Sequence, residues 1–343
     1  MMRLPISWLL AFTTAALALL LFGSLATGPM TLTLGESLRA LFAGQESGIE
    51  SYKLLIVKEI RLPRTLLCIA VGGILGLCGA VMQGLFRNPL ADPGIIGVSG
   101  GAALGAALAI VLLAPLGQQL QATVGVGLLP LLAFLGGALT TTLVYLLGTR
   151  EGGTSVTVML LAGVAITALS GAVIGLLTYL ADDQMLRNLS LWQMGTLAAG
   201  KPADVALALL TLVALLWLFM RDANPLNALL LGEGEARHLG VNVQSLKRRL
   251  ILLTAAGVGV AVAVSGMIGF VGLVVPHLVR LLAGPNHVRL LPLSALLGAA
   301  LLLAADMLAR TLLAPAELPV GIITALLGAP FFIWLLVTGR RAL

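Results

Sequence analysis

Residues 61–105 read RLPRTLLCIAVGGILGLCGAVMQGLFRNPLADPGIIGVSGGAALG, and in the apolar run from 62 to 85 the only charged residue is Arg64. A helix of about 20 such residues spans the roughly 30 Å hydrocarbon core of a bilayer. A membrane β-barrel would show alternating segments of about ten residues instead. The run therefore predicts a transmembrane α-helix, and Pro89 and Pro93 behind it each break a helix.

The rest of the chain has the same character. Of its 343 residues, 59% are apolar and 10% are charged, and the mean hydropathy is +1.08. Soluble domains have roughly 25% charged and 45–50% apolar residues. A soluble core of this size cannot absorb the surplus, which indicates an integral membrane protein. The 41 glycines are typical of helices that pack closely in lipid.

Apolar runs and helix breakers predict an all-α polytopic membrane protein with about ten transmembrane helices in a single domain, residues 1–343. The predicted spans lie near 5–27, 63–83, 95–115, 124–148, 155–180, 203–220, 250–265, 267–284, 291–309 and 320–338. A cleaved signal peptide is the alternative for the first span. Its apolar region would normally cover about 7–15 residues, so the longer run from Leu4 to Ala26 favours an uncleaved helix.

Loop charges predict the orientation in the membrane. Loops on one side, with both termini, collect 12 Lys and Arg against 5 Asp and Glu, and the other side collects 8 against 9. Cytoplasmic loops carry the excess of Lys and Arg. We therefore expect both termini to be cytoplasmic, and we attribute the net charge of +6 to topology instead of nucleic-acid binding.

One polar block interrupts the apolar chain on the predicted cytoplasmic side. Residues 229–249 read LLLGEGEARHLGVNVQSLKRR, with a short amphipathic piece between Gly232 and Gly240 and a second piece over 243–249. Two short helices joined by glycine can sit in a cleft of another protein and pass a rigid-body movement into the spans. A solvated loop that merely fixes topology is the alternative.

The sequence shows no catalytic motif and no metal site. GTLAAGKP at residues 195–202 has the spacing of a phosphate-binding loop, but Pro202 stands where the motif needs Ser or Thr for magnesium. Cys68 and Cys78, ten residues apart on a helix, would lie about 15 Å from each other, too far for a disulfide. We interpret them as packing residues, and we expect the chain to bind no cofactor.

Four segments together resemble the FecCD family of ABC importer permeases, which serve iron–siderophore complexes, haem and cobalamin. They are residues 61–105, LGEGEARHLGVNV (231–243), GMIGFVGLVVPHLVRL (266–281) and the C-terminal stretch 291–336. The resemblance implies a type II ABC importer permease in a bacterial inner membrane. It also implies a homodimer, two cytoplasmic ATPase subunits that hold ATP and magnesium, and a periplasmic binding protein.

The resemblance implies docking residues at the periplasmic side. The family's RLPR motif and its A-R-x-x-L-A-x-A-E-L-P stretch map to Arg61, Arg64 and Arg310, and in the family such arginines meet acidic residues of the binding protein. The fork of donors on arginine suits carboxylates. Anchoring of helix ends at lipid headgroups is the alternative, and Arg310 could neutralise Asp306, four residues earlier.

The resemblance also places the polar block on the ATPase. The residues implied in this coupling are Gly232, Glu233, Glu235, Ala236, Arg237, His238, Leu239 and Gly240.

Two further segments are candidates for the translocation path. DDQMLRNLSLWQMG, residues 182–195, fits an outer gate helix or an interfacial helix anchored by tryptophan; its candidates are Met185, Arg187, Trp192 and Met194. Asn88 and Pro89 mark the turn after the second span, where a cytoplasmic gate is a possible interpretation. Gly97, Gly101 and Gly105 predict close helix packing beside it.

The candidates for the transported ligand are haem, a ferric siderophore and a corrinoid. Arg187 could meet haem propionates, with Met185, Met194 or Tyr179 near the mouth, which favours haem over a ferric siderophore and over a corrinoid. An ion-coupled secondary transporter would need ionisable residues at the midplane. The predicted spans hold few, with Asp306 near a span end as the clearest exception.

Overall fold

The computed structural model describes residues 5–42, 50–114, 127–150, 153–198 and 200–339. Arg3, Arg340 and Arg341, which contribute to the topology count, lie outside them. Every predicted span contains a helix. These are α1 (Ile6–Ala26), α4 (Leu62–Leu85), α5 (Val98–Val111), α7 (Leu128–Gly148), α8 (Val156–Leu180), α10 (Pro202–Arg221), α13 (Val243–Ser265), α14 (Val271–Ala283), α15 (His287–Thr311) and α16 (Val320–Gly339).

The spans differ in length. Seven helices of the described chain are long and apolar enough to cross a membrane, while α5, α14 and the apolar part of α16 are shorter. A short helix can lie at membrane depth when other helices surround it. The all-α polytopic fold is confirmed.

The second piece of the polar block is not a separate helix. It forms the first two turns of α13, which runs without a break from Val243 to Ser265. The side chain of Asn242 caps this helix by accepting a hydrogen bond from the Ser245 amide at 3.1 Å. Polar side chains in the first two turns interrupt the apolar run, so the predicted start at residue 250 was seven residues too late for the helix.

One region at the end opposite the polar block was not predicted. It comprises α2 (Leu34–Phe42), α3 (Ser51–Leu55) and the π-helical turn η1 (Ile56–Arg61), which leads directly into α4. Lys53 pairs with Glu36 at 2.7 Å and so joins α3 to α2. Short amphipathic helices carry a weaker hydropathy signal than a membrane span, which explains the omission.

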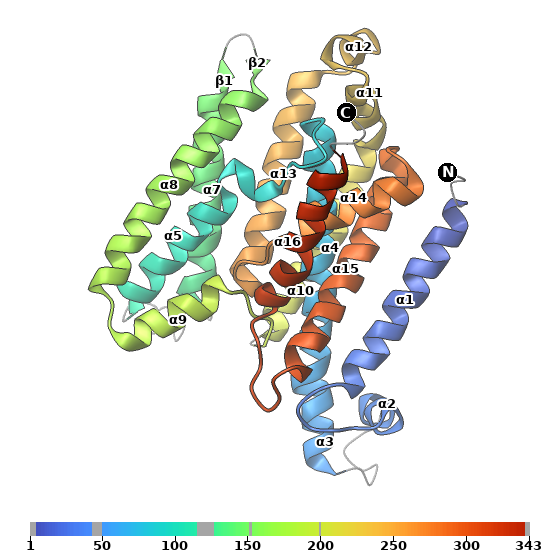
Figure 1. The fold of residues 1–343 in the computed structure, drawn as a ribbon, viewed down its shortest axis with the longest axis vertical. Coiled ribbons are helices and arrows are strands. Elements are labelled where there is room, and N and C mark those ends of the chain that lie inside the picture. Colours follow the sequence, from blue (N-terminus) through green and yellow to red (C-terminus); the bar gives the residue numbers. More distant parts are fainter. Residues whose placement is uncertain (1–4, 43–49, 115–126, 151–152, 199, 340–343) are drawn as a thin grey trace.

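The helices form two groups, the first of them around α4 (Figure 1). The buried α4 packs against α10, α13, α14 and α15, while α5, α7 and α8 form a second group that meets α13. A Cβ atom at Gly101 or Gly105 would overlap backbone oxygens of α7, so these glycines pack helices together as predicted. Cys68 and Cys78 are buried and unpaired on α4.

The two ends of the bundle carry different elements (Figure 1). At one end lie α11 (Ala223–Leu230), α12 (Glu233–His238) and the hairpin of β1 (Thr149–Arg150) with β2 (Gly153–Thr154). We call it the α12 end; the start of α1 and the end of α16 point to it. The α2 end carries α2, α3 and the loop between α15 and α16, with α9 (Asp183–Gln193) on its side of the bundle.

Candidate functional site

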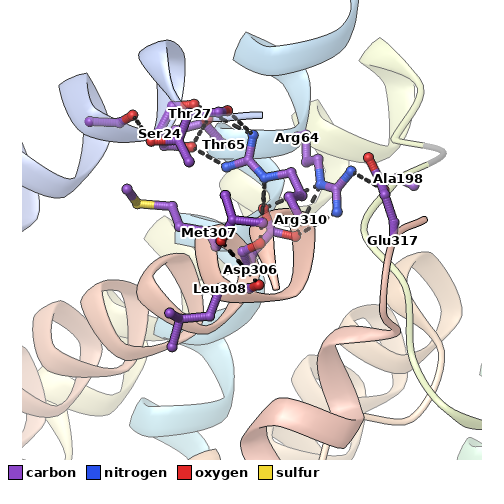
Figure 2. A network of polar contacts seen from close by, with 12 residues as sticks. Ser24, Thr27, Arg64, Thr65, Ala198, Asp306, Met307, Leu308, Arg310 and Glu317 are labelled. Atoms are coloured by element: carbon purple, nitrogen blue, oxygen red, sulfur yellow. Dashed lines mark hydrogen bonds and ion pairs between the residues drawn. The ribbon is translucent and has the colours of Figure 1, made fainter. Parts of the chain in front are cut away.

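An arginine cluster, made of Arg64, Asp306, Arg310 and Glu317 (Figure 2), lies near the α2 end, where α4 begins and α15 ends (Figure 1). Asp306 is fully buried at its centre. The Arg64 guanidinium reaches Asp306 Oδ1 through Nε at 3.0 Å and Nη2 at 2.9 Å. Arg310 Nε lies 3.0 Å from Asp306 Oδ2. One carboxylate therefore pairs with two guanidinium groups, from α4 and from its own helix α15, and compensates one of their two positive charges.

The same cluster fastens α1 to the other two helices. Arg310 donates to Ser24 Oγ at 2.8 Å and to the Thr27 carbonyl at 3.1 Å. The hydroxyls of Ser24 and Thr65 lie 2.7 Å apart. Arg61, one turn before Arg64, donates to the Leu25 carbonyl at 2.7 Å. A buried guanidinium needs such partners for its donors, because burial of an unpaired one would cost several kcal/mol, roughly 3–5.

Arg64 has a second, more accessible partner. Its Nη1 lies 2.7 Å from Glu317 Oε2, and the Glu317 side chain is 34% exposed. Glu317 belongs to the loop between α15 and α16 (Figure 2). The cluster thus ends at the surface in a carboxylate.

The three arginines predicted to dock the binding protein are almost completely buried. Arg61 is 4%, Arg64 5% and Arg310 2% exposed. The guanidinium groups point into the bundle, which argues against the headgroup alternative, and the alternative pairing of Arg310 with Asp306 is confirmed. Docking by these arginines stays a prediction, and in this conformation Glu317 shields Arg64. The pairing was beyond sequence reasoning because Glu317 lies 253 residues from Arg64.

At the α12 end, the predicted amphipathic piece is a short helix between two glycines. Gly232 and Gly240 have φ of 118° and 81°, a region that residues with a Cβ adopt only at a cost. Ala236 is completely buried and seats α12 on the bundle. The remaining predicted coupling side chains point outward or are half-buried; they are Glu233, Glu235, Arg237, His238 and Leu239.

Hydrogen bonds attach α11, which leads into α12, to the spans. Asn227 donates to the Asn286 side chain at 3.0 Å and accepts from the His287 amide at 2.8 Å. Asp222 accepts from Arg249 Nε at 2.7 Å. These contacts fix α11 to α15 and α13, so a displacement of the exposed α12 face can reach both spans.

The residues predicted to form an outer gate lie on α9 or directly after it. Asp182 caps the helix by accepting from the Met185 amide at 2.8 Å. Arg187 and Met194 are exposed and Met185 is half-buried. Trp192 is 8% exposed and lines a cavity of ≈ 740 Å³ between α5, α7, α10 and α13. The four residues therefore do not share one exposed face.

The end of α9 is tied to two other helices. The Met194 carbonyl accepts from the Gly321 amide of α16 at 3.1 Å, and the Thr196 amide donates to the Ser265 carbonyl of α13 at 2.7 Å. A Cβ at Gly321 would overlap the Met194 carbonyl. Met194 thus marks the contact of the predicted outer gate with the start of α16.

The predicted inner gate residues lie at the opposite end of the molecule. Asn88 and Pro89 are exposed in the turn after α4, and Asn88 Oδ1 accepts from the Leu90 amide at 2.9 Å. Pro89 lines a shallow depression together with His277 of α14 and Phe331 of α16. The helix α16 therefore passes both candidate gates, one at its first turn and one in its second half.

The phosphate-loop lookalike is part of a helix cap. The Lys201 amide donates to Asp204 Oδ2 at 3.3 Å at the start of α10, and Pro202 is the first residue of that helix. The element before it is the helix α9, whereas a phosphate-binding loop follows a strand. Within the described ranges, no group of three His, Cys, Asp or Glu side chains is placed to hold a metal ion.

A model of the FecCD transport family matches residues 16–338. The chain belongs to the FecCD transport family. It is 47% identical to the hemin transport system permease protein HmuU of Yersinia pestis, over 97% of this chain and 96% of that protein. It is 44% identical to the cobalamin import system permease protein BtuC of Halobacterium salinarum, over 87% of this chain and 77% of that protein.

A solved structure shows the same fold. It is described as an inward-facing conformation of an ABC transporter of the metal-chelate type, with 33% sequence identity and a TM-score of 0.82. The superposition covers 97% of this chain and 99% of that one. The chain is thus a multi-pass membrane permease of an ABC importer, and the predicted family, fold and role as an ABC importer permease are confirmed.

Proposed function

We propose that this permease carries haem from the periplasm to the cytoplasm by alternating access, with a ferric siderophore as the other iron-containing candidate. The observation that carries the proposal is the 47% identity to a hemin permease over nearly the full length of both chains. Cobalamin is the second candidate, because a cobalamin permease is 44% identical. Uptake measurements distinguish the two ligands.

The assembly that we propose has two copies of this chain, two ATPase subunits and one binding protein. The face of α12 that points away from the bundle supports an ATPase contact at this end. Apolar side chains of α8 and α16, among them Leu161, Leu169, Leu327 and Trp334, are more than half exposed. A second copy that covers part of these faces would enclose a path beside α16. ATP and magnesium belong to the ATPase, and this chain contributes no catalytic group.

We place the α12 end in the cytoplasm of a bacterium whose inner membrane holds the protein. The excess of Lys and Arg in the loops of that side supports this orientation, and the start of α1 and the end of α16 both point to it, as an even number of spans requires. The α2 end would then face the periplasm and receive the binding protein.

Uptake by the complete complex tests the proposal. The permease is reconstituted into vesicles with the ATPase and binding protein encoded beside it, and haem, a ferric siderophore and cobalamin are compared. We expect ATP-dependent uptake of haem, which a variant ATPase unable to hydrolyse ATP abolishes. Preferred uptake of cobalamin would move the assignment to the second candidate. Uptake driven by an ion gradient without ATP would instead favour a secondary transporter.

A further inference from the structure

A buried lysine joins three separate elements at the α12 end. Lys247, in the second turn of α13, has a side chain only 3% exposed. Its Nζ lies 2.6 Å from Glu233 Oε1 of α12. The same Nζ donates to the Thr154 carbonyl of β2 at 3.0 Å. The neighbouring basic residues Arg248 and Arg249 are exposed, so Lys247 is placed differently from the rest of its basic run.

A second residue one turn earlier holds the same hairpin. Gln244 Oε1 accepts from both the amide and the hydroxyl of Thr154, each at 3.2 Å. Residues three apart share a helix face, so Gln244 and Lys247 contact the hairpin side by side. Thr154 is 7% exposed. The contact between α13 and the hairpin therefore excludes most solvent.

The hairpin leads directly into the α7–α8 helix group. Ser155 follows β2 and caps α8 by accepting from the Val158 amide at 3.5 Å. α8 then runs to the opposite end of the bundle, where α9 follows it (Figure 1). A movement of the hairpin would thus act on the first turn of the helix that precedes the candidate outer gate.

A buried ammonium group is expensive unless its partners are well placed. An apolar side chain of similar length would fill the same space without that cost. Because α12 is already joined to α13 through residues 239–242, the chain needs no ion pair for that connection. The hairpin is separated from α12 by 79 residues or more along the chain. No short stretch of backbone joins these two elements, so Lys247 connects them through side-chain contacts.

We propose that Lys247 is a positioning residue that transmits displacement of α12 to the hairpin and hence to α8, in addition to the covalent route into α13. The inference rests on the proposed function, because it assumes that an ATPase moves α12. Movement of α13 would reorient the group around α4 and would press on α5 and α7, which α13 contacts directly. The route through the hairpin adds α8, the helix that precedes α9.

The test compares ATP hydrolysis with uptake in vesicles that hold the complete complex. Lys247→Met keeps the length of the side chain and removes its two polar contacts. Glu233 tolerates this change because it is one-third exposed and Arg237 is 3.8 Å away. We expect normal assembly and retained hydrolysis, with haem taken up per ATP reduced by about tenfold, the change that roughly 1.4 kcal/mol of lost coupling would produce.

Two matched variants separate transmission from stability. Arg248→Met removes the same charge at the next residue, which is exposed, and should leave the uptake per ATP unchanged. Lys247→Arg keeps donors for both partners and should restore most of the coupling. Unchanged uptake per ATP in Lys247→Met would overturn the proposal. So would a parallel loss of assembly, hydrolysis and uptake that Lys247→Arg does not repair.

A failure of the proposed function would look different. In that case the unmodified complex would show no ATP-dependent haem uptake; if it imports cobalamin, the same comparison is made with cobalamin. Should Lys247→Met not assemble, Glu233→Gln weakens the same tie from the α12 side while it preserves an acceptor. Unchanged uptake per ATP in Glu233→Gln would then count against the transmission role.

Discussion

The two ends of the molecule use charged residues in opposite ways. At the α2 end, Arg64, Asp306 and Arg310 are nearly inaccessible and satisfy one another. At the α12 end most charges of the polar block are exposed, and Lys247 is the buried exception. A buried network makes a rigid joint because loss of any member leaves an unpaired charge. Exposed charges cost little and remain available to a partner.

The difference indicates which end can move as a body and which end is held by separate contacts. The arginine cluster joins α1, α4 and α15, so these helices should move together at the α2 end. The α12 end is held by several separate contacts, among them those of Asn227, Asp222 and Lys247. Each of these contacts can be broken without breaking the others, so each can be tested separately for its role in transmitting movement from α12.

The largest expected effect comes from Asp306→Ala. This change removes the carboxylate between two buried guanidinium groups, and breaking a buried pair in this way costs about 3–5 kcal/mol. We expect little folded protein after extraction and a markedly lower melting temperature for the remainder. Size-exclusion chromatography and thermal unfolding in detergent measure both.

A control for this prediction is the removal of a carboxylate at the other end. Glu235→Ala changes an exposed residue of α12 and should leave the melting temperature within the error of the wild type. If Asp306→Ala were equally stable, the arginine cluster would not be the rigid joint that its burial indicates.

The next effect concerns coupling instead of folding. Ala236→Pro removes a backbone donor inside α12, whose amide bonds to the Gly232 carbonyl at 3.0 Å, and such a change costs about 3 kcal/mol or more locally. Because α12 lies outside the membrane spans, the permease should still be extracted as a folded dimer. We expect ATPase association and ligand uptake near background, as measured by co-purification and vesicle transport. Wild-type transport by this variant would show that the polar block only sets topology.

The apolar helices of the predicted spans were predictable and the arginine cluster was not. An apolar run of 20 residues indicates a span wherever it occurs, and α8 and α15 follow their predicted ranges closely. The burial of Arg64 depends on residues more than 240 positions away, which no local pattern contains. Charge reversal at Arg64 would add a carboxylate beside Asp306, so it would test folding before it tests docking.

A smaller effect is expected at the rim of the cluster. Glu317 is 34% exposed and contacts Arg64 on the side away from Asp306. Since solvent weakens such a pair, Glu317→Gln should lower stability by about 1 kcal/mol at most. Thermal unfolding of Glu317→Gln and of Asp306→Asn, measured in parallel, compares the contributions of the two carboxylates to stability. Equal losses would show that the cluster is a single unit that extends to the surface.

The smallest effect separates exposed pairs from the buried cluster at the α2 end itself. Hydrogen bonds from Lys53 and Thr33 lower the pKa of Glu36 from its ordinary value of 4.5 to about 2. The folded-state pKa lies below that of the unfolded chain, so this contribution to stability is fully present above pH 4.5. It is lost as the pH falls from 4.5 towards 2.

Fluorescence of a Phe42→Trp reporter, at a position 83% exposed on the same short helix, can follow the loosening of α2 across this range. We expect a shift between pH 4.5 and 2 that is small because the pair is solvent-screened. In the Glu36→Gln background the shift should shrink to the part that comes from Glu50, whose carboxylate lies 2.8 Å from the same Lys53 Nζ, since the glutamine does not titrate. A shift of the same size in both backgrounds would assign the transition to another group and leave the Lys53–Glu36 pair without a role in holding α2 against α3.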